Sequence, residues 1–307
     1  MQHSIWIWVA FTSAILVLLL VDLRLAGRRR DGLSRRQAAW WSVSWVLLAT
    51  GFAGVVYRWQ GTEPAQEYLA GYLIEKSLSV DNLVIFSLLF AYFRVPRAEQ
   101  HRVLFLGVLG ALVMRAACIL GGVALIDRFS WMSYLLGCVL LLASVRLAAQ
   151  GDLPRGRDPG RNAVVRAFRR VMPVTAEFQG ARFVLRRDGQ WFATPLMVAL
   201  MALEAADLVF ALDSIPAVLA VTTDPFIVFS SNVFALLGLR ALYFVIADVQ
   251  SRLRHLKPAL AFVLAFVGLK LLLSHLIVIP VWLSLTVIAG ALGIAVLTSR
   301  WHHAATG

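Results

Sequence analysis

Long apolar runs recur along the whole chain, and short polar or basic segments separate them. A helix rises about 1.5 Å per residue, so it needs roughly 20 apolar residues to cross the hydrocarbon core of a bilayer. The pattern predicts an all-α fold, a polytopic membrane protein with about nine transmembrane helices. The expected spans are 4–23, 38–57, 68–93, 103–125, 131–149, 195–219, 226–247, 258–276 and 281–299.

The composition favours a membrane protein over a soluble one. Of the 307 residues, 60% are hydrophobic and 15% are charged, against about 45–50% and about 25% in an ordinary globular chain. The mean hydropathy is +0.77. A soluble domain of this size could not bury so much apolar surface, and a chain this apolar is not intrinsically disordered. With two cysteines, a disulfide scaffold is excluded too.

Basic residues lie mostly between the apolar runs, in every second connecting segment. Segments 24–37, 94–102, 146–194, 248–257 and 300–307 hold 23 of the 29 Lys and Arg residues. The intervening segments hold two, Arg58 and Arg128. Because basic loops stay in the cytoplasm, we expect the N-terminus outside and the C-terminus inside. The net charge of +12 thus indicates contact with membrane lipid, and a nucleic-acid partner is not expected.

Residues 150–193 form a long basic cytoplasmic loop. An apolar stripe of helical spacing runs through Val164, Val165, Phe168, Val171 and Met172, with arginines around it. The stripe predicts a basic amphipathic helix on the anionic cytoplasmic leaflet. An Asp-Gly pair further on predicts a small hairpin. A solvated basic loop is the alternative, and in either form the segment offers a surface for protein partners.

Two parts of the chain match at an offset of 125 residues, which places Arg115 over Arg240 and Asn82 over Asp207. The repeat unit is three helices, with spans 3–5 matching spans 6–8. Three is odd, so the second copy is inverted in the membrane, as in many secondary transporters. The expected parts are an N-terminal two-helix segment (1–66), the first repeat (67–149), the basic loop (150–193), the second repeat (194–276) and a C-terminal helix and tail (277–307).

Five acidic residues lie well inside apolar runs: Glu75, Asp81, Glu204, Asp207 and Asp213. Each charge at a helix centre costs about 2.5–3.5 kcal/mol, so five cost on the order of 15 kcal/mol, comparable to the stability of a whole protein. All five lie on spans 3 and 6, the first helices of the two repeats. Buried charges of this kind mark an ion or proton pathway.

Oxygen-bearing side chains accompany these acids. Asn82 follows the acids of span 3. In span 6, Asp207 and Ser214 are seven residues apart and therefore share one helix face. Pro216 is expected to break or kink that helix and free backbone carbonyls. Carboxylate, amide, hydroxyl and carbonyl oxygens suit hard cations such as Mn²⁺, Mg²⁺ or Ca²⁺.

Four bases also lie within the spans: Lys76, Arg115, Arg240 and Lys270. They permit an inert network of buried ion pairs. They also permit a cation site that an arginine or lysine occupies and then leaves, or one where protons exchange for the cation. No nucleophile–base pair, phosphate loop or HExxH motif occurs in the sequence, so neither an enzyme nor an organic cofactor is expected.

The segments EKSLSVDNLVIF and LEAADLVFALDSIPAVLAVTTDPFIVFSSNVFALLGLRALYF together resemble the TerC family of integral membrane proteins. The resemblance implies a bacterial inner-membrane protein that exports Mn²⁺, and the family is also linked by name to tellurium resistance. It implies metal contacts at Glu75, Asp81, Asn82, Glu204, Asp207 and Asp213, with Ser214 as a further contact.

The leading hypothesis is an exporter of divalent cations, with Mn²⁺ bound at the midplane between spans 3 and 6 and the four bases as counter-charges. A membrane scaffold in a tellurite or metal stress-response complex, acting through the 150–193 loop, is the alternative. A third interpretation is an exporter of small amino acids or tellurium oxyanions, for which the basic residues are the ligands.

Overall fold

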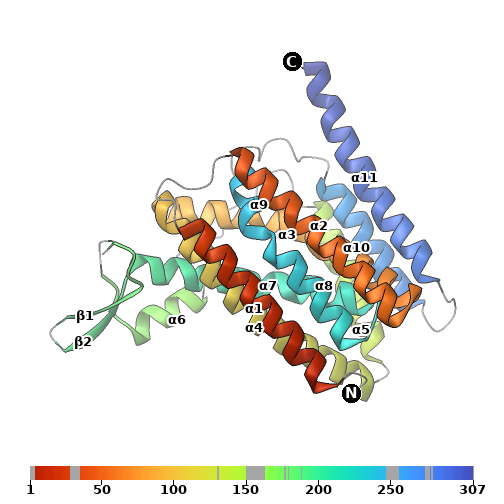
Figure 1. Ribbon diagram of the computed structural model, residues 1–307, viewed down its shortest axis with the longest axis horizontal. Helices are drawn as coiled ribbons and strands as arrows, with labels where there is room; N and C mark the ends of the chain where they lie inside the picture. Colours follow the sequence, from red (N-terminus) through yellow and green to blue (C-terminus); the bar gives the residue numbers. More distant parts are fainter. Residues whose placement is uncertain are drawn as a thin grey trace.

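The structure, a computed structural model, describes residues 4–27, 35–129, 131–149, 163–175, 178, 180–187, 189–246, 256–273, 277 and 279–306. These residues form a bundle of long helices with a small hairpin at one edge (Figure 1). The first five helices are α1 (Ile5–Gly27), α2 (Arg35–Gln60), α3 (Thr62–Tyr92), α4 (Arg97–Arg128) and α5 (Met132–Ala149). After them come α6 (Ala163–Val171), β1 (Val184–Arg187), β2 (Gln190–Ala193), α7 (Pro195–Leu219), α8 (Pro225–Leu237), α9 (Leu239–Ile246), α10 (Leu256–Leu272) and α11 (Val281–Thr306).

Within the described part of the chain, six helical stretches are long and apolar enough to cross a membrane. They are Ile5–Asp22, Arg36–Gln60, Arg97–Ile126, Met132–Ala149, Pro195–Leu219 and Pro225–Val245. Two further apolar stretches, Pro258–Leu272 and Val281–Ala295, are shorter. The fold is therefore a multi-pass helical membrane protein, as predicted. The number of nine spans stays a prediction, because α3 carries several charges and the last two stretches are short.

Large apolar side chains cover much of the outer surface of the bundle. Val113 is 69% exposed and Leu47 is 66% exposed. A soluble monomer rarely exposes large apolar patches, whereas lipid tails are as apolar as these side chains. The exposed apolar surface of these helices is thus the surface expected to face lipid.

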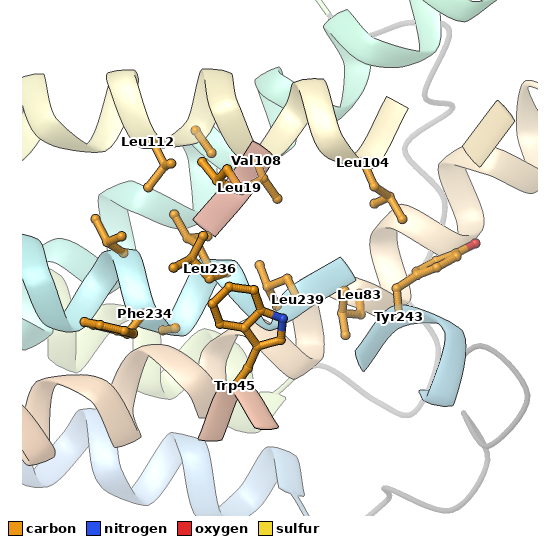
Figure 2. Close-up of a cluster of buried hydrophobic side chains, with 14 of the residues drawn as sticks. Leu19, Trp45, Leu83, Leu104, Val108, Leu112, Phe234, Leu236, Leu239 and Tyr243 are labelled. Atoms are coloured by element: carbon orange, nitrogen blue, oxygen red, sulfur yellow. The ribbon is translucent and has the colours of Figure 1, made fainter. Parts of the chain in front are cut away.

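Helices α3 and α7 lie at the centre and contact each other. α3 also packs on α8, and α7 packs on α4. α5 lies along α10, α2 covers α3 and α9, and α11 covers α3 and α10. Figure 2 shows part of the apolar core, where Leu19 of α1, Trp45 of α2, Val108 of α4 and Phe234 of α8 converge.

Helix α7 runs through Pro216 and ends at Leu219, so the helix does not break at this proline, and the kink stays a prediction. Pro216 lies in the last turn of α7. It removes one backbone hydrogen bond, and because only three helical residues follow it, the helix tolerates that loss. The chain instead interrupts its helix at Gly238, the residue between α8 and α9.

Residues 163–193 join the bundle through α6 and the hairpin. The predicted hairpin is confirmed: β1 and β2 pair antiparallel, and Gly189 in the turn adopts φ +79°, a conformation that favours glycine. The predicted helix is confirmed as α6, but its stripe does not all face lipid. Val165 is fully buried and Phe168 packs on the core, because α6 lies against α7.

Candidate functional site

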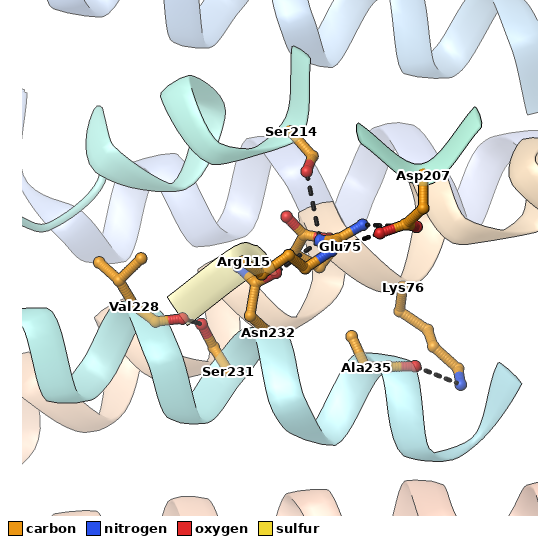
Figure 3. Close-up of polar contacts among 9 residues, drawn as sticks. All are labelled: Glu75, Lys76, Arg115, Asp207, Ser214, Val228, Ser231, Asn232 and Ala235. Atoms are coloured by element: carbon orange, nitrogen blue, oxygen red, sulfur yellow. Dashed lines mark hydrogen bonds and ion pairs between the residues drawn. The ribbon is translucent and has the colours of Figure 1, made fainter. Parts of the chain in front are cut away.

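Arg115 lies at the centre of a buried polar cluster that draws on four helices (Figure 3). Its Nη1 donates to Oε2 of Glu75 on α3 at 2.5 Å and to Oδ1 of Asn232 on α8 at 2.5 Å. The same nitrogen lies 3.3 Å from Oγ of Ser214 on α7. Nε and Nη2 each donate at 3.4 Å to an oxygen of Asp207, also on α7. One guanidinium thus connects the two central helices to α8.

Helical spacing explains how the cluster assembles. Asp207 and Ser214 are seven residues apart and point to the same side of α7, as predicted from the sequence. Glu75 and Ser79 are four residues apart on α3, and both are buried. Arg115 lies in the middle of α4, where its side chain is 1% exposed. Arginine suits this position because its planar fork can donate to several acceptors at once.

The cluster carries a net charge of −1 when all its groups are ionised, because two carboxylates face one guanidinium. Two polar atoms of the cluster and one on neighbouring Ser79 also have no hydrogen-bond partner among the described residues. These atoms are Oε1 of Glu75, Oγ of Ser79 and Nδ2 of Asn232, and each is buried. Buried polar groups are usually paired. Oε1 of Glu75 is therefore a buried acceptor that no described residue satisfies.

The other predicted acidic residues lie around this cluster or apart from it. Glu204 is half-buried one turn before Asp207 on α7 and lies against Gly110 of α4. Asp213 is half-buried, and Arg146 of α5 is the cation that acts on its carboxylate. Asn82 is 4% exposed, whereas the side chain of Asp81 lies outside the described atoms.

The remaining three predicted bases lie elsewhere in the bundle. Nζ of Lys76 donates to the carbonyl of Ala235 near the end of α8 at 3.3 Å. Lys270 donates to Oγ of Ser284 at 3.1 Å. Arg240 forms an ion pair with the carboxylate of Asp22 on α1 and also donates to its backbone carbonyl at 3.0 Å.

Two important residues were not predicted from the sequence. Asn232 contacts Arg115, and its one signal was a lone amide in an apolar helix. Asp22 pairs with Arg240, but it lies at the end of the first span, where a charged residue is common and gives no signal. A small cavity of about 10 Å³ has both Arg240 and Asp207 in its lining. This is room for about one water molecule.

Within the part of the chain that the structure describes, no three His, Cys, Asp or Glu residues gather in a group that could hold a metal. The carboxylates that do meet, Glu75 and Asp207, meet through Arg115. The described site is therefore a charged cluster with its own internal cation, and it is not a cage of acids.

The fold and this cluster define the class: a polytopic helical membrane protein with ionisable side chains buried between its helices. The chain belongs to the TerC family, since residues 60–306 match the model described as "Integral membrane protein TerC family". It is 43% identical to "Uncharacterized membrane protein STKORF319" of Myxococcus xanthus, covering 98% of this chain and 94% of that protein. It is 41% identical to "Putative membrane-bound redox modulator Alx" of Escherichia coli K12, covering 96% and 94%. No solved structure matches the chain.

Proposed function

We propose that this chain is a secondary transporter that exports a divalent cation, Mn²⁺, across the bacterial inner membrane. Glu75 and Asp207 are the main ligands, and Arg115 is an internal cation that holds the site between transport events. One observation carries the proposal: a fully buried guanidinium holds side chains of α3, α7 and α8 together.

The energetics favour a functional role for this cluster over a structural one. Charged residues within membrane spans are costly and usually face an ion or substrate pathway. Well-packed apolar residues can often replace a buried ion pair without loss of stability. A membrane helix bundle that required only cohesion would not need Arg115 together with Glu75 and Asp207. We therefore infer that the charges serve the cargo.

The chemistry of the ligands selects the class of cargo. When Arg115 withdraws, it leaves the carboxylates of Glu75 and Asp207, the hydroxyl of Ser214 and the amide oxygen of Asn232. Oxygen ligands of this kind suit hard divalent cations. The charges then balance, because two carboxylates meet a cation of charge +2. An oxyanion or an amino acid carboxylate would instead be repelled by these two acids. The ligand set therefore favours a metal cation over such substrates.

The packing of the central helices supports the inverted repeat, which stays a prediction. Exchanging the two copies would convert α3 into α7 and α4 into α8. The contact of α3 with α8 then becomes the contact of α7 with α4, and both are present. α5 and α10 would exchange with each other across their shared interface. In transporters of this plan the two halves move around a central site, and Arg115 and Asp207 lie on opposite halves.

The orientation in this proposal follows from the placement of basic residues. The segments rich in arginine are those that connect the helices on one side, and basic loops stay in the cytoplasm. The N-terminus would then lie outside and the C-terminus inside. The bacterial origin of the relatives supports the inner membrane as the location.

The test is Mn²⁺ flux into liposomes that contain the purified protein, with Ca²⁺, Zn²⁺ and a pH gradient as comparisons. Glu75→Gln and Asp207→Asn should each abolish saturable Mn²⁺ movement. Glu63→Gln is the matched control, because Glu63 is exposed in the first turn of the same helix. Asp81→Asn and Asp213→Asn test the wider ligand set that the sequence suggests. Unchanged flux in both Glu75→Gln and Asp207→Asn would refute the site.

The scaffold hypothesis predicts the reverse result. Deleting part of the 150–193 loop would then destroy function, while Glu75→Gln and Asp207→Asn would be tolerated. Comparing these variants in cells, for growth in excess Mn²⁺ and in tellurite, separates the two hypotheses.

A further inference from the structure

The hairpin carries an exposed basic and aromatic surface that the proposed transport does not use. Arg186 and Trp191 are both exposed, Trp191 at 58%. They are directly opposed across β1 and β2, and the guanidinium carbon of Arg186 lies 5.8 Å from the centre of the Trp191 ring. A guanidinium stacked on an indole keeps its hydrogen-bond donors free.

The two faces of the hairpin differ in chemistry. Neighbouring residues of a strand point to opposite faces, and directly opposed residues share one face. Arg186 therefore lies with Trp191 on one face, which we call the Trp191 face. Arg187 lies with its partner Gln190 on the other face. Each face thus holds one arginine of the hairpin tip, but only one face pairs it with an aromatic ring.

The hairpin is held firmly at the start of a membrane helix. Thr194, which is fully buried, links the hairpin to α7. Its Oγ1 donates to the carbonyl of Arg182 at 2.7 Å, and its backbone N–H donates to the carbonyl of Phe183 at 3.0 Å. On the other side of the hairpin, Ala193 N–H donates to the carbonyl of Pro173 at 2.9 Å. The base of the hairpin therefore lies where α7 enters the bundle.

Figure 1 shows the hairpin and α6 extending sideways from the helix bundle. α6 adds exposed arginines at Arg166 and Arg170 and an exposed apolar residue, Val171, at 87%. From 163 to 193 the sequence holds six arginines against two acidic residues, Glu177 and Asp188. A surface with this charge, at the end of a membrane helix, lies within reach of the lipid headgroups.

We propose that the Trp191 face of the hairpin docks on the headgroups of anionic phospholipids in the adjacent leaflet. Arg186 binds phosphate oxygens and Trp191 enters the interface, where its amphipathic ring is most stable. Attraction to an anionic leaflet lowers the free energy of basic residues at its surface. A nucleic acid or an acidic protein would be attracted by the same charge. Neither explains why a tryptophan and Val171 are exposed near the start of a membrane helix.

The experiment uses the full chain in nanodiscs of phosphatidylcholine, with and without phosphatidylglycerol. A fluorescent label is attached at Gln190→Cys, after Cys118→Ser and Cys138→Ser remove the free thiols. Lipids with a nitroxide on the headgroup then quench the label according to its distance from the membrane surface. Quenching should increase when phosphatidylglycerol is added and decrease with salt, because exposed charges are screened.

Matched variants on the two faces test which surface docks. Arg186→Gln should lower the docked-to-undocked ratio by roughly fivefold, the value of one basic residue at an anionic surface. Trp191→Ala should also lower it, and Arg186→Lys should retain most of the docking because the charge remains. Arg187→Gln is the control with the same loss of charge on the opposite face, and it should change the ratio by about twofold or less.

Equal quenching in both lipid compositions would overturn the proposal. An equal loss in Arg186→Gln and Arg187→Gln would also overturn it, because a diffuse attraction would then replace docking by one face. These outcomes are independent of Mn²⁺ flux, so this proposal and the proposed transport can fail separately.

Discussion

Glu75 and Arg115 form an ion pair across α3 and α4 in which Oε2 lies 2.5 Å from Nη1 and each side chain is 1% exposed. A buried pair is a weak source of net stability, yet removing one partner is strongly destabilising because the other charge stays buried. Arg115 has a second buried carboxylate, Asp207, beside it. The cluster is therefore sensitive to the loss of its cation.

Replacing Arg115 by Met should lower the free energy of unfolding by roughly 3–5 kcal/mol, because Glu75 and Asp207 then face each other without a counter-charge. Adding Glu75→Gln to Arg115→Met should recover part of this loss. Denaturation of the three variants in detergent measures the coupling between the two positions. Strictly additive losses would show that Glu75 and Arg115 do not interact.

Replacing Arg115 by Lys tests its role as the internal cation. Lysine keeps the charge but cannot donate twice to Asp207 as the guanidinium does. If Arg115 competes with Mn²⁺, a weaker hold on the ligands should raise the apparent affinity roughly tenfold, the equivalent of one charge-assisted hydrogen bond. Mn²⁺ binding and flux measured on the same preparation check this. Affinity that falls together with flux would contradict competition.

Gly110 provides the space that Glu204 occupies between α4 and α7. A Cβ at this position would lie 2.2 Å from Oε1 of Glu204, so Gly110→Ala should displace that carboxylate. If Glu204 lies on the ion path, Mn²⁺ flux should fall several-fold. Gly121→Ala is the control on the same helix, because no atom lies within 4 Å of its added Cβ. Equal flux in the two variants would remove Glu204 from the path.

The membrane class and the central polar residues were predictable, because burial in lipid makes charged side chains conspicuous in an apolar sequence. Glu75, Asp207, Ser214 and Arg115 were all identified, and the structure brings them together. The spacing of Asp207 and Ser214 on α7 also gave the correct shared face.

The partners of each base were not predictable, because a sequence pattern does not say how helices pack. Arg240 matches Arg115 in the repeat, yet it pairs with Asp22 of α1, a helix outside the repeat. Asn232 shows the same limit, since one amide in an apolar helix carries no directional signal. The interruption at Gly238 was not predictable either, because a single glycine within an apolar run does not mark the end of a helix.

The pair of Asp22 and Arg240 should fasten α1 to α9. Asp22→Asn removes the partner of a guanidinium that is 4% exposed, so it should lower the free energy of unfolding by several kcal/mol. The exchanged pair Asp22→Arg with Arg240→Asp should recover part of that loss. Unfolding in detergent measures the effect. A loss in the exchanged pair as large as the sum of its single variants would show that the contact is not electrostatic.

The interface between α5 and α10 depends on two small residues, Gly137 and Gly268. A Cβ at Gly268 would lie 3.0 Å from Cβ of Leu140 and 3.1 Å from the carbonyl oxygen of Gly137. The first atom is bonded to the backbone of α5 and the second belongs to that backbone, so neither can move without the helix. The two helices must therefore separate, and Gly268→Ala should destabilise the protein by about 1–3 kcal/mol. Gly290→Ala on α11 meets no atom within 4 Å. It should instead stabilise its helix by roughly 0.5–1 kcal/mol. Opposite signs in thermal unfolding of the two variants are expected, and equal signs would contradict close packing at α5 and α10.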